Sequence, residues 1–227
     1  MANSASDAGG SEYEIRKNMI EEGIISQMVT LPSNMFSSVT LPATLWFFDK
    51  ARAQSKKRDE ILFVDARNIF TQIDRAHRKF TDEQIKNLGI ITRLYEGDTE
   101  AFENLIAEYR AEMEAAPETA EDKNTKTKEY WAEQIEWLTS RFPDGVYRDV
   151  VGLCKVAKLE GEDGIKDQDY SLNPGRYVGV VIEDDGMTAD EFKAEMLSLN
   201  EELAKLNEEA HKLEKSISTN LLKILGE

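Results

Sequence analysis

The chain has 227 residues, of which 41% are apolar and 32% are charged, and its net charge at neutral pH is −16. This length accommodates one large domain or a domain with an extension, and the apolar fraction is sufficient for a core. No apolar run approaches the roughly 18 residues of a membrane span, so we expect no membrane partner. A single cysteine, Cys154, rules out an internal disulfide, and the first residues lack the features of a secretory signal. We therefore expect a cytoplasmic protein.

Charge is distributed unevenly along the chain. Residues 96–144 hold 14 acidic and 5 basic residues, whereas residues 50–79 hold 9 basic and 4 acidic ones. Because phosphate contacts need Lys and Arg, the acidic total argues against a free nucleic-acid binder. The basic segment contains Lys56, Lys57 and Arg58 in a predicted turn. This cluster is either a solvated hairpin tip, which is the more common case, or a contact with a nucleic-acid backbone.

The first part of the chain predicts an α/β arrangement. Residues 12–22 have helical periodicity, and Gly23 stands where a C-terminal cap belongs. Apolar strands are predicted near 24–31, 43–48 and 61–66. A helix followed by apolar strands is typical of the late part of an α/β sheet.

From Thr81 onward the pattern becomes mainly helical. Thr81 and Gln84 have the spacing of a capping box, and apolar residues then recur at helical intervals as far as Tyr95. The remaining predicted elements are helices over 99–115 and 127–138, a short strand over 150–157 and a compact turn over 169–179.

The connection between the first two predicted strands contains Phe36, shortly after a Pro-Ser-Asn turn. Binding residues favour loops at strand ends, so an aromatic side chain here could contact a ligand. A core aromatic in a strand connection is the alternative, and the pattern alone favours it.

Residues 188–225 have the clearest periodicity of the chain. Apolar residues recur at alternating spacings of four and three, which predicts a helix with a heptad seam. The flanking Glu195, Glu202 and Glu209 disfavour pairing between two copies and favour a basic partner helix. A long helix packed on its own domain is the alternative. The seam consists of Phe192, Met196, Leu199, Leu203, Leu206, Ala210, Leu213 and Ile217.

The sequence carries no catalytic signature of its own. It has no Gly-x-Gly pair that could open a nucleotide-binding loop. Its two histidines, His77 and His211, and its single cysteine cannot assemble a zinc cluster. We therefore predict no metal site.

Five blocks of sequence carry a resemblance to a known family. They are Glu14–Glu21, Leu31–Phe36, Leu45–Phe48, Leu62–Arg67, and Asp169–Tyr170 together with Pro174–Gly179. Taken in order, they resemble the C-terminal part of the methyltransferase (M) subunit of type I restriction-modification systems, which is a DNA adenine-N6 methylase. The resemblance covers most of the chain and is weakest over 97–142.

The resemblance implies the end of an S-adenosylmethionine-dependent methyltransferase sheet, a helical region and a coiled-coil-like helix. The implied parts are 1–67, 68–187 and 188–227, the last for subunit assembly. Family members carry a glycine-containing cofactor loop and an Asn-Pro-Pro-aromatic motif ahead of these blocks, and this sequence has neither. We therefore expect a fragment or split gene product that alone neither binds S-adenosylmethionine nor methylates DNA.

The resemblance also implies roles for particular residues. Phe36 matches the aromatic residue that stacks on the flipped target adenine, and Lys56, Lys57 and Arg58 become candidates for DNA-backbone contacts. The C-terminal helix would pack on helices of the specificity (S) subunit. The implied partners are this subunit, the N-terminal part of the M subunit, and DNA. A stand-alone helical interaction module without enzymatic activity is the alternative function.

Overall fold

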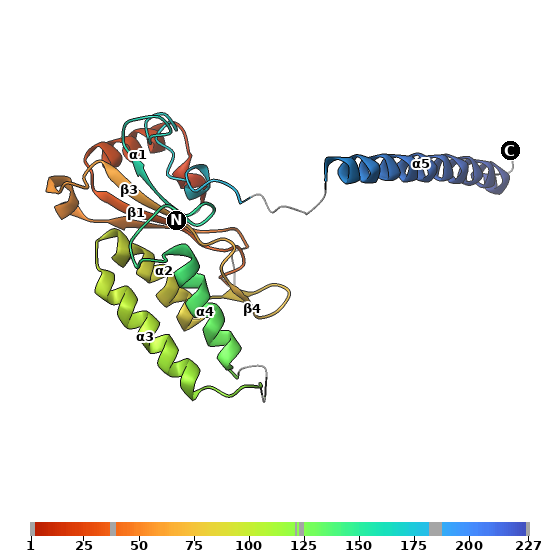
Figure 1. The fold of residues 1–227 in the computed structure, drawn as a ribbon. Coiled ribbons are helices and arrows are strands. Elements are labelled where there is room, and N and C mark those ends of the chain that lie inside the picture. The colour runs from red at the N-terminus through yellow and green to blue at the C-terminus, as the bar shows by residue number, and fades with distance from the viewer. Residues whose placement is uncertain (1–2, 37–39, 121, 123–124, 182–187, 226–227) are drawn as a thin grey trace. The chain divides into compact units, whose positions relative to one another are not determined.

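The computed structural model describes residues 3–36, 40–120, 122, 125–181 and 188–225, and the chain divides into two units, Met1–Val181 and Ile182–Glu227 (Figure 1). The second unit contains one helix, α5 (Ala189–Leu225). The elements of the first unit are, in chain order, η1 (Asn3–Ser6), α1 (Ser11–Glu21), β1 (Ile25–Thr30), β2 (Thr44–Phe48), η2 (Lys50–Gln54), β3 (Glu60–Asp65), β4 (Thr71–Gln72), β5 (Arg78–Lys79), α2 (Asp82–Tyr95), α3 (Thr99–Ala115), α4 (Lys128–Arg141), β6 (Cys154–Lys158) and η3 (Pro174–Arg176).

A mixed sheet of four strands, in the order β2-β1-β3-β6, forms the centre of the first unit. The inner strands β1 and β3 are parallel, while β2 and β6 pair with them in antiparallel fashion at the two edges. β6 follows the helices in sequence, so the sheet is completed by a long-range pairing. The predicted order of a sheet, then helices, then a long terminal helix is confirmed.

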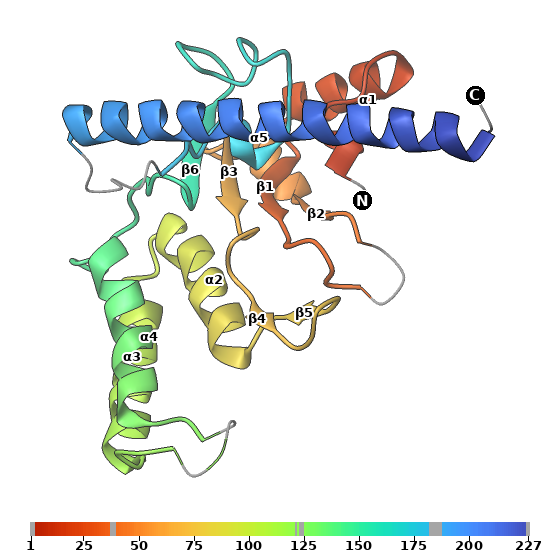
Figure 2. The same cartoon turned by 90° about the vertical axis from the view of Figure 1, so that its right-hand side faces the viewer.

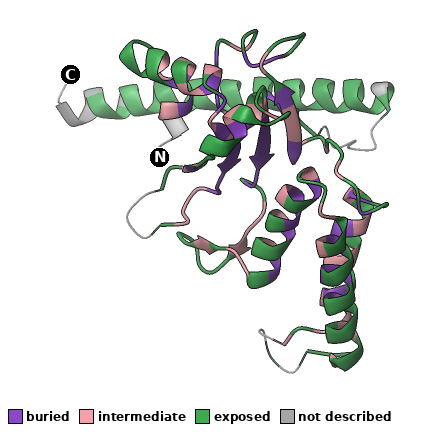
Figure 3. Ribbon diagram, turned by 90° about the vertical axis from the view of Figure 1, so that its left-hand side faces the viewer, coloured by how far each residue is buried: buried purple, intermediate pink, exposed green. Residues whose placement is uncertain are grey.

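Both faces of the sheet are covered, with α1 on one side and α2 on the other (Figure 1), and Figure 2 shows the strands side by side. Successive residues of β3 point to opposite faces, so Leu62 and Val64 join one core with residues of α2, α3 and α4. Ile61 and Phe63 join a second core with Ile20 of α1 and the segment that leads to η3. Figure 3 shows β1 and β3 as buried strands. Burial on both faces explains the continuous apolar run Ile61–Val64 of β3.

The end of α1 confirms the predicted cap at Gly23. Gly23 has a φ of 70°, its N–H donates to the Ile20 carbonyl at 2.9 Å, and the next N–H donates to Met19 at 3.4 Å. This pair of bonds is a Schellman motif, which needs a left-handed residue at this position. The cap directs the chain from α1 into β1.

The helices α2, α3 and α4 pack together beside the sheet. The Thr81 hydroxyl accepts a hydrogen bond from the Gln84 backbone N–H at 3.2 Å, and the Thr81 N–H donates to the Gln84 side chain at 2.9 Å, so the predicted capping box begins α2. The fully buried Tyr109 of α3 lies with its ring centroid 5.4 Å from that of Trp131 in α4. The three helices predicted from Thr81 onward are thereby confirmed.

A buried carboxylate, Glu83, ties α2 to α4. It accepts hydrogen bonds from Lys126 at 2.7 Å and from the Tyr130 hydroxyl at 2.8 Å. Burial by itself would raise the pKa of Glu83, but these two hydrogen bonds outweigh it, and the pKa lies below its ordinary value of 4.5. The ionised form therefore stabilises the folded state.

Replacing Glu83 by glutamine should lower the free energy of unfolding by about 1–2 kcal/mol, because the charge-assisted bonds become ordinary ones. Because the pKa of Glu83 is lowered in the folded state, the full loss of stability should be measured above the ordinary pKa of 4.5. The difference between the two proteins should vanish as the pH falls through the pKa of Glu83 in the folded state. Urea unfolding across that pH range measures the difference. Glu133→Gln, which changes an exposed carboxylate of α4, is the control and should show no comparable loss.

The short hairpin of β4 and β5 was not predicted from the sequence. Thr71 pairs with Lys79 and Gln72 with Arg78. Two-residue strands are too short to produce a period-two pattern, which explains the omission.

In the second unit, α5 extends over on the order of 55 Å at 1.5 Å per residue. Thr188 and Glu191 cap its beginning by reciprocal hydrogen bonds of 2.7 Å and 3.3 Å. Within the described residues, none of the helices combines the length and apolarity needed to cross a membrane.

Candidate functional site

The carboxyl ends of β1 and β3 meet at one edge of the sheet. The strands are parallel, and Thr30 at the end of β1 stands beside Asp65 at the end of β3. In open α/β sheets ligands bind outside this edge. Three loop segments begin or return here, and the first of them contains the candidate residue Phe36.

Phe36 belongs to the first of these segments, the connection from β1 to β2. Asn34 turns the chain with a left-handed φ of 60°, and its N–H donates to the Thr40 carbonyl at 3.3 Å. The Phe36 side chain is 48% exposed and belongs to neither hydrophobic core. An aromatic ring with an exposed face at this edge can stack on a planar ligand.

The hairpin of β4 and β5 is attached to the same connection through Arg78. The Arg78 backbone N–H donates to the Asn34 carbonyl at 2.9 Å, and its guanidinium donates to the Ser33 hydroxyl at 3.0 Å. The guanidinium also lies 3.9 Å from the centroid of the Phe70 ring. These contacts hold the hairpin beside the loop that carries Phe36.

A third segment, the turn around η3, reaches this edge through Arg67. The Arg67 guanidinium donates to both carboxylate oxygens of Asp65, and this hydrogen bonding raises the pKa of Arg67. A Cβ at Gly175 would lie 2.8 Å from the same guanidinium. Glycine therefore permits the close approach of the turn to the end of β3.

Lys56, Lys57 and Arg58 lie in the predicted turn, directly before β3 begins, and therefore at the opposite end of the parallel strands from Phe36. Lys57 donates to the Tyr95 carbonyl at 2.6 Å and to Glu96 at 2.9 Å. Arg58 donates to the Glu21 carbonyl at 2.9 Å. Two of the three cations thus have intramolecular partners, and the structure does not bring the cluster together with Phe36.

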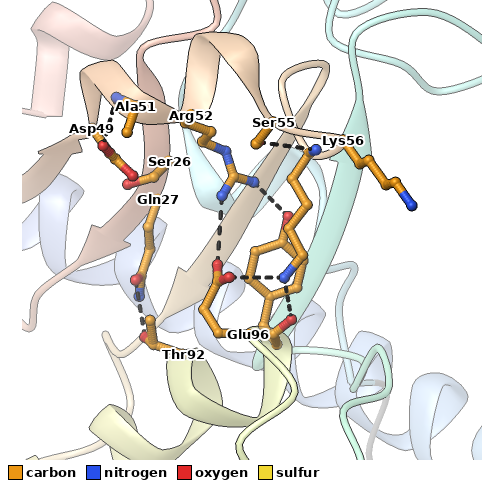
Figure 4. Close-up of a pocket in the computed structure, with 11 residues that line it drawn as sticks. Ser26, Gln27, Asp49, Ala51, Arg52, Ser55, Lys56, Thr92 and Glu96 are labelled. Carbon is orange, nitrogen blue, oxygen red and sulfur yellow. Dashed lines mark hydrogen bonds and ion pairs between the residues drawn. The ribbon is translucent and has the colours of Figure 1, made fainter.

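A hollow of about 550 Å³ lies near this basic turn, between η2 and the end of α2 (Figure 4). Its central group is the buried Arg52, which pairs with Glu96 at 3.5 Å and donates to the Tyr95 hydroxyl. Burial raises the pKa of Tyr95 to about 12. Most of the polar groups that line the hollow bond one another, Arg52 Nε being an exception, and these bonds connect α2 to the sheet. The hollow lies away from the edge with Phe36.

The predicted seam of α5 is exposed along its described length. The exposed fractions of Phe192, Met196, Leu199, Leu203, Leu206, Leu213 and Ile217 range from 50% to 66%. On the polar side of the helix, ion pairs join Lys212 to Glu208 and His211 to Glu214. A helix cannot bury a stripe on its own surface, so this seam offers a site for another helix.

The basic residues of the hairpin and Arg67 were not among the candidates predicted from the sequence. They contribute to the basic excess of residues 50–79, which is the signal that could have indicated them, but only Lys56, Lys57 and Arg58 were predicted from it. Within the described residues, no group of three or more His, Cys, Asp or Glu side chains could hold a metal ion.

Residues 1–107 match the family model described as N-6 DNA Methylase. The chain is 32% identical to the type I restriction enzyme MjaIX methylase subunit of Methanocaldococcus jannaschii, over 100% of this chain and 31% of that protein. It is 31% identical to the HindI methylase subunit of Haemophilus influenzae, over 96% of this chain and 37% of the relative. The crystal structure of a type I methyltransferase subunit from Streptococcus thermophilus covers 78% of this chain and 25% of its own, with 20% identity and a TM-score of 0.47.

The chain spans about a third of the length of these two curated relatives. Similarity extends over nearly the whole of this chain, including the weaker region between residues 97 and 142. The family indicated by the five sequence blocks is confirmed. The chain corresponds to part of a type I restriction enzyme methylase subunit, and its residues 1–107 match the N-6 DNA methylase family.

Proposed function

We propose that this chain supplies the target-base contact and the S-subunit contact of a type I DNA adenine-N6 methyltransferase. It acts together with the remaining part of the M subunit, which binds S-adenosylmethionine. Phe36 stacks on the flipped adenine, and α5 docks on helices of the S subunit. The three parts proposed from the sequence, 1–67, 68–187 and 188–227, are then the sheet end, the helical region and the assembly helix.

The observation that carries the proposal is the exposure of Phe36 at the carboxyl edge of the parallel strands. A base extruded from duplex DNA loses its stacking neighbours and needs an apolar face in their place. A half-exposed ring on a loop next to the strand ends meets that need. A ring buried in either core could not.

The position of β2 at the edge of the sheet indicates that another part of the protein packs against this edge. Among the described strands, β2 pairs with β1 alone, and its residues Leu45, Phe47 and Phe48 are more than 40% exposed. An edge strand with exposed apolar side chains is a template for further pairing. We infer that the preceding part of the M subunit covers this edge.

S-adenosylmethionine does not fit the residues described here. At the candidate edge, β1 and β3 lead into the buried Leu31 and Ala66, and neither is followed by the glycine loop whose amides would hold a nucleoside. The cofactor therefore belongs to the complete subunit. The residues of this chain bind the base, hold it in position and exclude water from it.

A reconstituted enzyme tests the proposal. The chain is co-expressed with an S subunit and with the region of the Haemophilus influenzae HindI methylase subunit to which it does not align. Transfer of a radiolabelled methyl group to duplex DNA should require this chain. A chain that co-purifies with both partners while methyl transfer proceeds equally without it would instead support a stand-alone interaction module.

A further inference from the structure

We propose that the hairpin of β4 and β5 contacts the phosphate backbone of duplex DNA through Arg75 and Lys79, beside the loop that carries Phe36. This inference rests on the proposed function, because it assumes that DNA approaches this edge of the sheet. It assigns the backbone contact to a surface other than Lys56, Lys57 and Arg58.

The hairpin is a local basic surface in an acidic chain. Residues 67–79 contain four basic residues and one acidic residue, whereas the whole chain has a net charge of −16. Arg75 and Lys79 are exposed, and within the described residues neither of them forms an ion pair. Both side chains are therefore available to a phosphate, which attracts cations irrespective of base sequence.

The single acidic residue of the hairpin, Asp74, is occupied in shaping its tip. Its carboxylate accepts hydrogen bonds from the backbone N–H groups of Ala76 at 2.7 Å and His77 at 2.9 Å. It also binds the His77 ring at 2.8 Å. The negative charge is thus turned toward the hairpin's own backbone, where it repels an approaching phosphate less than a free carboxylate would.

Arg78 acts as a positioning residue for this surface. Its guanidinium is held by Ser33 and by the Phe70 ring, and its backbone is held by Asn34. Ser33 and Asn34 precede Phe36 by three and two residues. A duplex that presents a flipped base to Phe36 must bring its backbone close to that ring, and the attached hairpin lies alongside.

The charge of the other surfaces also favours an approach of DNA to the hairpin. The candidate edge is the end of the sheet away from the basic turn, where Lys57 and Arg58 already bind Glu96 and the Glu21 carbonyl. The segment 96–144, which includes α3 and α4, holds 14 acidic and 5 basic residues and repels a phosphate backbone. The hairpin is the basic surface that remains next to Phe36.

Fluorescence anisotropy of labelled duplex DNA with the reconstituted enzyme tests the inference over a series of salt concentrations. The variant combines Arg75→Gln with Lys79→Gln. Its affinity for DNA should fall roughly tenfold, and the slope of log K against log salt should decrease by about 2, one for each lost phosphate contact. Methylation at saturating DNA should remain, because neither residue touches the base.

The control variant combines Lys50→Gln with Lys56→Gln, two exposed lysines near the opposite end of the strands. It removes the same charge and should leave both the affinity and the salt slope nearly unchanged. Equal losses in the two variants would overturn the inference in favour of a general charge effect, and an unchanged hairpin variant would overturn it directly. If the unmodified enzyme binds no DNA, the proposed function fails, and this inference fails with it. Melting temperatures verify that both variants fold.

Discussion

Replacing Phe36 by alanine in the reconstituted enzyme should reduce methylation of duplex DNA about tenfold to a hundredfold while leaving cofactor affinity nearly intact. Stacking of a base on an aromatic side chain contributes roughly 1–3 kcal/mol, which corresponds to this range. The ring is 48% exposed and lies outside both cores, so its removal leaves no internal cavity. The loss should therefore concern the base and not the fold.

Initial rates of methyl transfer measure the effect, and calorimetric titration with S-adenosylmethionine measures the cofactor affinity. Phe36→Tyr preserves the aromatic face and should retain most of the activity. Ile15→Ala removes an apolar side chain of α1 that is 59% exposed and should change neither quantity. Unchanged turnover of Phe36→Ala, with the fold preserved, would mean that the ring does not stack on the base.

Elements that depend on local periodicity could be predicted from the sequence. The spacing of Thr81 and Gln84 sufficed for the beginning of α2, and Gly23 sufficed for the end of α1, because caps are determined by a few adjacent residues. The strands β1 and β3 followed from their apolar runs. The seam of α5 followed from its heptad spacing. Its side chains are exposed, as expected for a seam that has no partner helix.

Features that depend on long-range contacts could not be predicted. The pairing of β3 with β6 joins residues 90 to 98 positions apart, and no local pattern specifies it. Lys57 and Arg58 appear available in the sequence because their partners, Glu96 and the Glu21 carbonyl, lie far away along the chain. Conversely, the proximity of Arg75 to the loop of Phe36 could not be predicted, because it depends on the contacts by which Arg78 attaches the hairpin to that loop.

Changing Leu203 and Leu206 to glutamate together should abolish binding of the chain to an S subunit. These side chains are 56% and 55% exposed in the middle of the seam. A fully buried leucine contributes on the order of 1.5–3 kcal/mol, so the pair accounts for several kcal/mol of an interface formed by a second helix. Two carboxylates buried without partners would add a further penalty.

The acidic flanks specify the kind of partner that this seam accepts. Glu195, Glu202 and Glu209 are exposed beside it, so two copies of α5 would bring glutamates together, whereas basic residues on another helix would form pairs across the interface. We therefore expect the chain alone to self-associate only weakly. Sedimentation at increasing concentration measures this, and a stable dimer would contradict the assignment to an S subunit.

Pull-down with the S subunit, alongside thermal melting, tests the double variant. Binding should disappear while the melting transition of residues 1–150 remains, because α5 belongs to a separate unit. The control combines Ser198→Glu with Ala204→Glu, which adds the same two charges at exposed positions outside the seam and should preserve binding. Binding that survives Leu203→Glu with Leu206→Glu, or that survives truncation after Gly186, would locate the interface elsewhere in the chain. Loss in both double variants would mean that added negative charge, and not the apolar seam, determines the association.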